Sequence, residues 1–104
     1  MPTLFYPIED LGRGQTTESQ EFNVLSTKDV DVVLVQYAFD STGGLVPAQL
    51  EYTIGTQTIP VNGIYKGESI TIKFRNVSAG THRLVIHNAA IDINGAYGNG
   101  YIYY

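Results

Sequence analysis

Two histidines, His82 and His87, are the first residues whose types could support chemistry. Successive side chains of a strand point to opposite faces, so the odd separation of these two prevents them from binding one metal ion together on one strand. We expect His82 to be half-buried and hydrogen-bonded at a corner of the chain. We expect His87 to be exposed at the end of a strand.

Nucleophilic and acid–base chemistry has no recognisable arrangement in this sequence. The sequence contains the residue types of a serine triad, among them Ser69, Ser78, His82 and Asp92. No G-x-S-x-G turn is present, however, to expose a nucleophile. The carboxylate pairs fall in expected turns or at strand starts, which does not favour a glycosidase-like pair. A glycine-rich phosphate loop ahead of a helix is also absent. We therefore predict no catalytic residues, no cofactor and no enzymatic activity.

Metal binding has one incomplete candidate. Asp92, Asn94 and Gly95 are similar to the beginning of a calcium loop, and Asp40 would lie near them if both loops share one end of the domain. No glutamate follows at the required offset, and a turn explains these residues equally well. The chain has no cysteine, which excludes thiolate metal sites and disulfides. We predict no metal site, and calcium beside Asp40 and Asp92 stays open.

Tyrosine is the unusual residue type, because the chain has 8 of them and several cluster at its C-terminal end. Tyrosine offers a large, rigid contact area with a polar tip, which suits both protein interfaces and stacking on sugars. The alternative is that these rings pack into the rim of a small domain. The candidate contacts with a ligand or partner are Asn94, Tyr97, Asn99, Tyr101 and Tyr103.

The strands that must position these residues are clearest between residues 68 and 88. Ile70, Ile72 and Phe74 alternate with polar residues, and alternation resumes at His82 after a turn. This pattern predicts an antiparallel hairpin with one buried face. The sequence SAGTHRLVIHN resembles the stretch entering the penultimate strand of bacterial immunoglobulin-like and fibronectin-like modules. That resemblance implies a sandwich architecture and no functional residues.

Similar patterns recur along the rest of the chain. Residues 30–39 are apolar on both faces, so we expect the N-terminal segment or a partner subunit to cover the second face. Pro60 predicts an edge strand for residues 57–61. About seven strands without helical periodicity indicate an all-β fold, an antiparallel β-sandwich of immunoglobulin or fibronectin type, with a jelly roll as the alternative topology. One domain, residues 21–104, contains these strands.

Residues 1–20 are predicted to form an irregular N-terminal arm, because they contain prolines and glycines and show no sustained periodicity. The apolar side chains of this arm are too numerous to stay in water as one patch. They either fold back over the sandwich or dock on a neighbouring subunit. The candidate assembly residues are Leu4, Phe5, Tyr6, Ile8 and Leu11.

Charge and hydropathy limit the classes of partner. Only 15% of the 104 residues are charged, and the net charge of -4 comes from the first third of the chain. Without a basic stripe we expect no nucleic-acid partner. Without an apolar run of about 20 residues we expect no membrane insertion, and we find no signal peptide in the given chain. A polar surface with few charges is common on extracellular and virion proteins.

These observations favour a non-enzymatic structural, assembly or adhesion subunit of a phage particle, a filament or a bacterial surface. Such a subunit would lie on a virion or a cell surface and self-associate through its N-terminal arm and its tyrosine-rich C-terminal strand. The alternative is a carbohydrate-binding module that binds a glycan with the C-terminal tyrosines.

Overall fold

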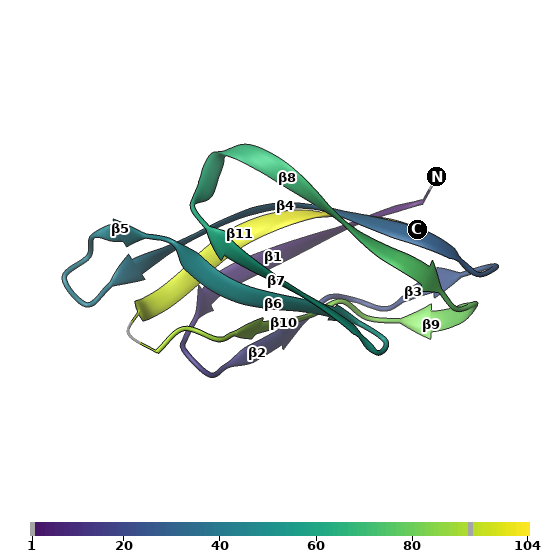
Figure 1. Cartoon of the computed structure of the whole chain (residues 1–104), viewed down its shortest axis with the longest axis horizontal. Helices are drawn as coiled ribbons and strands as arrows, with labels where there is room; N and C mark the ends of the chain where they lie inside the picture. Colours follow the sequence, from purple (N-terminus) through teal and green to yellow (C-terminus); the bar gives the residue numbers. More distant parts are fainter. Residues whose placement is uncertain (1, 92) are drawn as a thin grey trace.

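The computed structural model describes residues 2–91 and 93–104, and every regular element in this part of the chain is a β-strand (Figure 1). The molecule is elongated, with principal extents of 46 × 25 × 19 Å. The strands are β1 (Thr3–Leu11), β2 (Thr16–Glu18), β3 (Phe22–Val24), β4 (Lys28–Asp40), β5 (Leu45–Val46), β6 (Ala48–Ile54), β7 (Gln57–Gly63), β8 (Tyr65–Val77), β9 (Gly80–His82), β10 (Val85–Asn88) and β11 (Ile93–Tyr103).

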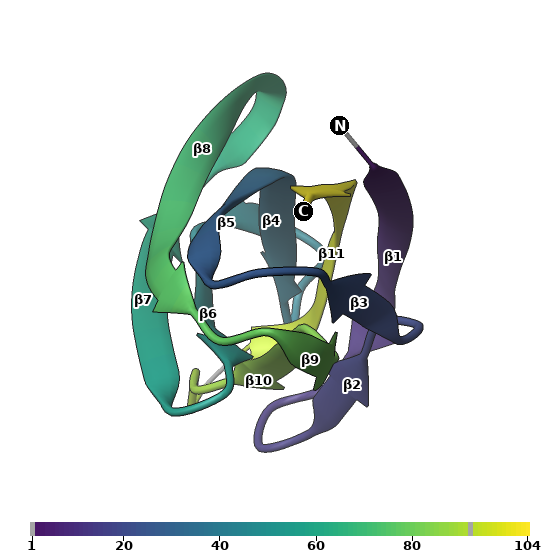
Figure 2. The ribbon, with the colours of Figure 1, turned by 90° about the vertical axis from the view of Figure 1, so that its right-hand side faces the viewer.

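Two antiparallel sheets face each other and a small third sheet extends one of them (Figure 2). In the first sheet the order is β1-β11-β4, and both β5 and β8 pair with β4. The second sheet has the order β2-β10-β6-β7, and β3 pairs with β9 beyond it. The predicted all-β antiparallel sandwich is therefore confirmed.

The strand order identifies which of the two predicted topologies is present. In Figure 1, β2 and β3 follow one another along one line, and so do β9 and β10. When each pair is counted as one strand and the two-residue strand β5 is left out, eight strands form two sheets of order 1-8-3-6 and 2-7-4-5. This is the order of a jelly roll, the alternative to the immunoglobulin or fibronectin type.

The core lies between the two larger sheets and consists of alternate side chains of their strands. Val32 and Leu34 on the inner face of β4 are fully buried, as are Leu50 and Tyr52 of β6. All four belong to one continuous cluster of buried side chains. Full burial of an aliphatic side chain contributes about 1.5–3 kcal/mol, so a core of this kind stabilises a domain without disulfides.

One polar side chain in this core connects the two sheets. Gln36 of β4 is completely buried, and its amide nitrogen donates to the carbonyl oxygen of Val61 in β7 at 2.9 Å. The amide oxygen of Gln36 accepts a hydrogen bond of 2.8 Å from the hydroxyl of Tyr52 in β6. Because both ends of the amide have partners, its burial carries little penalty.

The N-terminal segment differs from the irregular arm that its composition predicts. Residues 3–11 form β1, which pairs with the C-terminal strand β11 along its length (Figures 1 and 2). Tyr6 lies directly opposite Gly100 in this pairing, and its hydroxyl donates to the carbonyl oxygen of Val33 at 3.3 Å. The missing side chain of Gly100 makes room for the tyrosine ring. A partner strand distant in sequence therefore orders this segment.

Candidate functional site: an aromatic sheet face

The C-terminal strand β11 presents four of the predicted contact residues on one face. Gly100 and Ile102 are buried on its inner side. Alternation then places Tyr97, Asn99, Tyr101 and Tyr103 on the outer side, where they are half-buried or exposed. Asn94 belongs to the same strand, but its side chain lies outside the described part of the structure.

At one end of this face three aromatic rings form a cluster. The rings of Tyr37 and Tyr97 are cross-strand partners on β4 and β11, and they stack with centroids 5.8 Å apart and planes inclined by 15°. Phe39 contacts both rings edge-on, at 5.8 Å from Tyr37 and 5.7 Å from Tyr97. Contacts of this geometry hold aromatic rings in fixed orientations.

A second aromatic pair lies further along the same face. Phe5 of β1 is opposite Tyr101 of β11, with ring centroids 5.5 Å apart in an edge-to-face contact. Phe5 is 51% exposed and Tyr101 is 44% exposed, so both rings are available to a partner. Together with the cluster described above, they form a surface that we call the aromatic face: Phe5, Val33, Val35, Tyr37, Phe39, Tyr97, Asn99, Tyr101 and Tyr103.

Two charged groups flank the three-ring cluster. The ammonium group of Lys66 lies 5.2 Å from the centroid of the Tyr37 ring, a cation–π arrangement. On the other side Asp10 lies at a bulge of β1 with a positive φ of 46°. Partial burial and the adjacent Asp10 carboxylate, which accepts a hydrogen bond from Tyr97, raise the pKa of Tyr97. The tyrosine hydroxyl at this end is therefore a neutral, oriented group.

The structure separates the predicted assembly residues into two groups. Tyr6, Ile8 and Leu11 are buried in the core of their own domain, and Leu4 is half-buried against the same core. Phe5 alone points outward, onto the aromatic face. The physical reason is the alternation of β1, which sends every second side chain from Leu4 to Ile8 inward, and the bulge after Ile8, which turns Leu11 inward as well.

Some residues of the aromatic face were not among the predicted contacts. Tyr37 and Phe39 come from residues 30–39, whose second face was expected to be covered by the N-terminal segment or a partner. Instead β1 lies at the edge of the sheet, and this second face stays half-exposed. The signal was present in the alternation of Val33, Val35, Tyr37 and Phe39, but sequence alone does not show that β11 lies beside them.

Each of the two histidines forms a hydrogen bond within the fold. His82 is half-buried as predicted, and its Nε2 lies 2.8 Å from the carbonyl oxygen of Ser78. His87 is half-buried rather than exposed, because its Nδ1 lies 3.2 Å from the Thr16 hydroxyl on the neighbouring strand β2. Among the described residues, no three His, Cys, Asp or Glu side chains come close enough to hold a metal ion.

The Asp40 carboxylate, half of the possible calcium site, has other partners. It accepts hydrogen bonds from the backbone N–H groups of Thr42 at 2.9 Å and Gly44 at 2.8 Å, and from the Thr42 hydroxyl at 2.7 Å. These donors lower the pKa of Asp40, the Thr42 hydroxyl most of all. Asp92 lies outside the described residues, so Asp40 is explained here by its loop alone.

The fold is shared with proteins of known structure, at low sequence identity. A 4-O-methyl-α-glucuronidase with specificity for decorated arabinogalactans has a TM-score of 0.65 at 15% identity over 90% of this chain and 14% of that one. A family 35 carbohydrate-binding module from Clostridium thermocellum has a TM-score of 0.61 at 12% identity over 88% of this chain and 70% of that one. An exo-β-1,3-galactanase from Phanerochaete chrysosporium has a TM-score of 0.57 at 14% identity over 97% of this chain and 26% of that one.

These likenesses show the fold alone, a β-sandwich that this chain shares with a carbohydrate-binding module. The chain spans only a small part of the two enzymes. No protein-family model and no curated protein sequence matches it. In the described part of the chain, no helix has the length and apolar character needed to cross a membrane.

Proposed function

We propose that this domain is a carbohydrate-binding module and that the aromatic face binds the glycan. The observation that carries the proposal is the alignment of half-buried and exposed rings from three neighbouring strands on one face of one sheet. A tyrosine or phenylalanine ring can cover the apolar C–H side of a sugar, and a tyrosine hydroxyl can bond its polar edge.

The dimensions and polarity of the face favour an extended, neutral glycan. From Tyr97 to Tyr103 the strand rises roughly 20 Å at about 3.4 Å per residue, so the face is longer than one sugar ring. The exposed carboxamide of Asn99 lies between the two aromatic groups and offers both a donor and an acceptor. The likeness to a carbohydrate-binding module and to two glycan-degrading enzymes supports the same proposal.

The proposal assigns binding without catalysis to this domain and places it where glycans are met, outside the cell or at its surface. Only 15% of the residues are charged, so uncharged polar and aromatic groups would make most of the contacts with a neutral polymer. A separate catalytic domain or partner would perform any reaction on the bound glycan.

Isothermal titration with soluble glycans tests the proposal, using arabinogalactan, β-1,3-galactan oligosaccharides and xylan oligosaccharides as probes. We expect at least one to bind, and Tyr101→Ala or Phe5→Ala to weaken it about tenfold, equivalent to 1.4 kcal/mol. Leu25→Ala is the matched control, because Leu25 is a large apolar residue, 87% exposed, that lies outside the face. Binding that Tyr101→Ala and Phe5→Ala leave unchanged would exclude the aromatic face.

Self-association through the same face is the second candidate function. Phe5 and Tyr101 form a contiguous exposed aromatic pair on a sheet, and such pairs are also common in protein interfaces. Deleting the N-terminal segment would be a poor test, since Tyr6 and Ile8 belong to the core. Light scattering of Phe5→Ala against the unsubstituted protein isolates the surface contribution: an unchanged mass would reject this candidate.

A further inference from the structure

An open pocket lies at the end of the sandwich opposite the three-ring cluster. The β6–β7 turn that borders it is at the right-hand end of Figure 1, whereas the ends of β4 and β11 that carry the cluster are on the left. The pocket has a volume of about 180 Å³ and is formed by the β6–β7 turn, the end of β8, and the corner between β8 and β9. Its lining residues are Ile54, Gly55, Thr56, Gln57, Asn76, Val77, Ser78 and His82.

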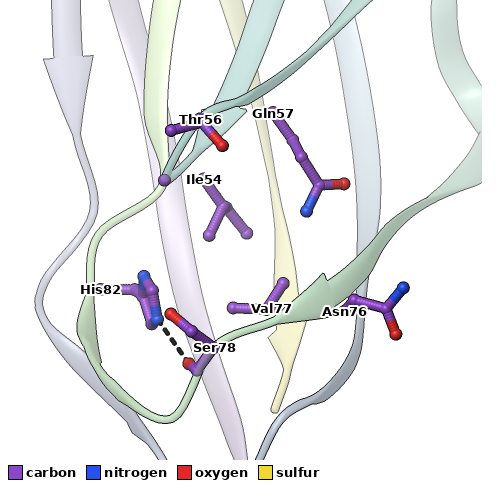
Figure 3. Close-up of a pocket in the computed structure, with 8 residues that line it drawn as sticks. Ile54, Thr56, Gln57, Asn76, Val77, Ser78 and His82 are labelled. Atoms are coloured by element: carbon purple, nitrogen blue, oxygen red, sulfur yellow. Dashed lines mark hydrogen bonds between the residues drawn. The ribbon is translucent and has the colours of Figure 1, made fainter.

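Hydrogen-bonding groups line one side of this pocket (Figure 3). Thr56 and Ser78 are exposed, and neither hydroxyl has a hydrogen-bond partner among the described residues. A carbonyl oxygen can only accept, so the 2.8 Å contact between His82 Nε2 and the Ser78 oxygen places the hydrogen on Nε2. The other ring nitrogen of His82, Nδ1, has no hydrogen-bond partner among the described residues. Two hydroxyls and one ring nitrogen are thus available on this side.

The rest of the lining consists of Ile54, Gly55 and Val77 together with the carboxamide side chains of Gln57 and Asn76. Figure 3 shows Ile54 and Val77 between the polar side chains. The amide of Gln57 forms two hydrogen bonds with the backbone of Arg75, at 2.5 and 3.0 Å, which fix that wall to β8. The lining residues include no aspartate, glutamate, lysine or arginine. A phosphate or carboxylate ligand would find no cation here, so the lining favours an uncharged ligand.

The volume limits the size of such a ligand. It corresponds to roughly six water molecules at about 30 Å³ each, and it falls below the range of about 300–1,000 Å³ that holds drug-sized molecules. Ile54 and Val77 are almost fully buried, so the polar groups around the rim of the pocket would make most of the contacts with a ligand. Such a lining matches a small ring that is rich in O–H groups. We propose that this end pocket binds a single neutral sugar unit, either free or at the terminus of a glycan.

This second site goes beyond the aromatic face and does not depend on it. The face offers flat rings along a sheet, which suit internal parts of an extended chain. The pocket is bounded by turns at the tip of the sandwich, which suits a terminal unit. The two sites can therefore be tested separately, and one can fail without the other.

Nuclear magnetic resonance titration of the ¹⁵N-labelled domain tests the pocket. The probes are glucose, galactose, mannose, xylose and arabinose, with glucuronate as the charged counterpart. We expect saturable shifts of Thr56, Ser78 and His82 for at least one neutral sugar in the millimolar range, and weaker or absent shifts for glucuronate. The absence of saturable shifts at the pocket for all five neutral sugars, or equal binding of glucuronate, would overturn the proposal.

Two conservative substitutions then assign the binding to the pocket hydroxyls. Thr56→Val and Ser78→Ala each remove a hydroxyl from an exposed residue, and we expect either one to weaken binding about threefold to tenfold. Thr27→Val and Ser41→Ala are the matched controls, since both residues are exposed and outside the pocket. Equal affinities in all four variants would overturn the pocket assignment. Tyr101→Ala should leave this titration unchanged. Failure of the pocket proposal can therefore be told apart from failure of the aromatic-face proposal.

Discussion

Replacing Gln36 with leucine should remove the polar connection between the two sheets. The side chain of Gln36 is completely buried, accepts a hydrogen bond from the Tyr52 hydroxyl at 2.8 Å and donates one to the Val61 carbonyl at 2.9 Å. Leucine has a similar size but offers neither a donor nor an acceptor. The Tyr52 hydroxyl, in a side chain that is also fully buried, would lose its partner without gaining access to water.

The size of the effect follows from these two contacts. A buried polar group left without a partner costs about 1–3 kcal/mol, and loss of the bond to Val61 adds about 1 kcal/mol. We therefore expect Gln36→Leu to lower the free energy of unfolding by about 2–4 kcal/mol, a large part of the ~5–15 kcal/mol typical of a domain. Gln49→Leu on β6 is the control, because Gln49 is exposed, and it should change stability by less than about 0.5 kcal/mol.

A double-mutant cycle with Tyr52→Phe isolates the hydrogen bond itself. Tyr52→Phe alone leaves the Gln36 amide oxygen unpaired, whereas in the Gln36→Leu background it removes the orphaned hydroxyl. Because replacing both partners with apolar groups is nearly neutral, the double variant should be at least about 1 kcal/mol more stable than additivity predicts. Urea unfolding followed by far-ultraviolet circular dichroism measures all four proteins. Additive effects, or a Gln36→Leu cost below about 0.5 kcal/mol, would refute this reasoning.

Three further predictions concern titration and packing. Burial raises the pKa of Tyr6 and Tyr52 above the usual 10.0, so above that pH the unfolded chain releases protons that the folded chain retains. Urea unfolding at increasing pH should therefore show a free energy of unfolding that does not change up to about pH 10. Above that pH it should fall by up to about 1.4 kcal/mol per pH unit for each tyrosine, and Tyr52→Phe should reduce this slope. Gly100→Ala places a Cβ against backbone of the neighbouring strand and should lower stability by about 3 kcal/mol in urea, whereas Gly67→Ala, with open space around it, should have little effect. Asp40 has a lowered pKa, so the amide hydrogens of its loop should stay protected from exchange above pH 3.8 and lose this protection below that pH. In Asp40→Ala these amide hydrogens should exchange faster at every pH. The tyrosine prediction would be contradicted by a stability that does not change at alkaline pH. The glycine prediction would be contradicted by equal stability of the two glycine variants, and the Asp40 prediction by unchanged amide exchange in Asp40→Ala.

Strands were predictable from the sequence because alternation is a local property, but their pairing was not. The segment 68–88 was predicted as one hairpin, and it contains most of β8 together with β9 and β10. Strands β8 and β10 lie in opposite sheets, where β8 pairs with β4 and β10 pairs with β2 and β6. The turn residues 78–80 carry the chain from one sheet to the other, and turn composition does not distinguish such a corner from a hairpin. Asn62 and Gly63, a strong hairpin signal in sequence, likewise precede a crossing from β7 to β8.

The edge position of residues 57–61 was predictable for a different reason. Pro60 lacks the N–H group that a central strand needs, and β7 does lie at the edge of its sheet. The aromatic face was predictable only in part. Spacing along one strand places Tyr97 and Tyr101 on a common side, but the contribution of Tyr37 depends on the register between β4 and β11. Register between distant strands is set by tertiary packing, which no local pattern in one sequence encodes.

The structure places residues of the two functions predicted from sequence on one surface. Phe5 was predicted to mediate assembly and Tyr101 to contact a ligand or a partner, and the two are cross-strand partners with ring centroids 5.5 Å apart. A second subunit that covered one ring would cover the other, so glycan and subunit could not occupy the face together. By linkage, saturating glycan should dissociate any dimer formed through this face. Light scattering with and without a bound oligosaccharide measures this coupling, and a dimer whose mass is unaffected by bound glycan would show that assembly uses a different surface.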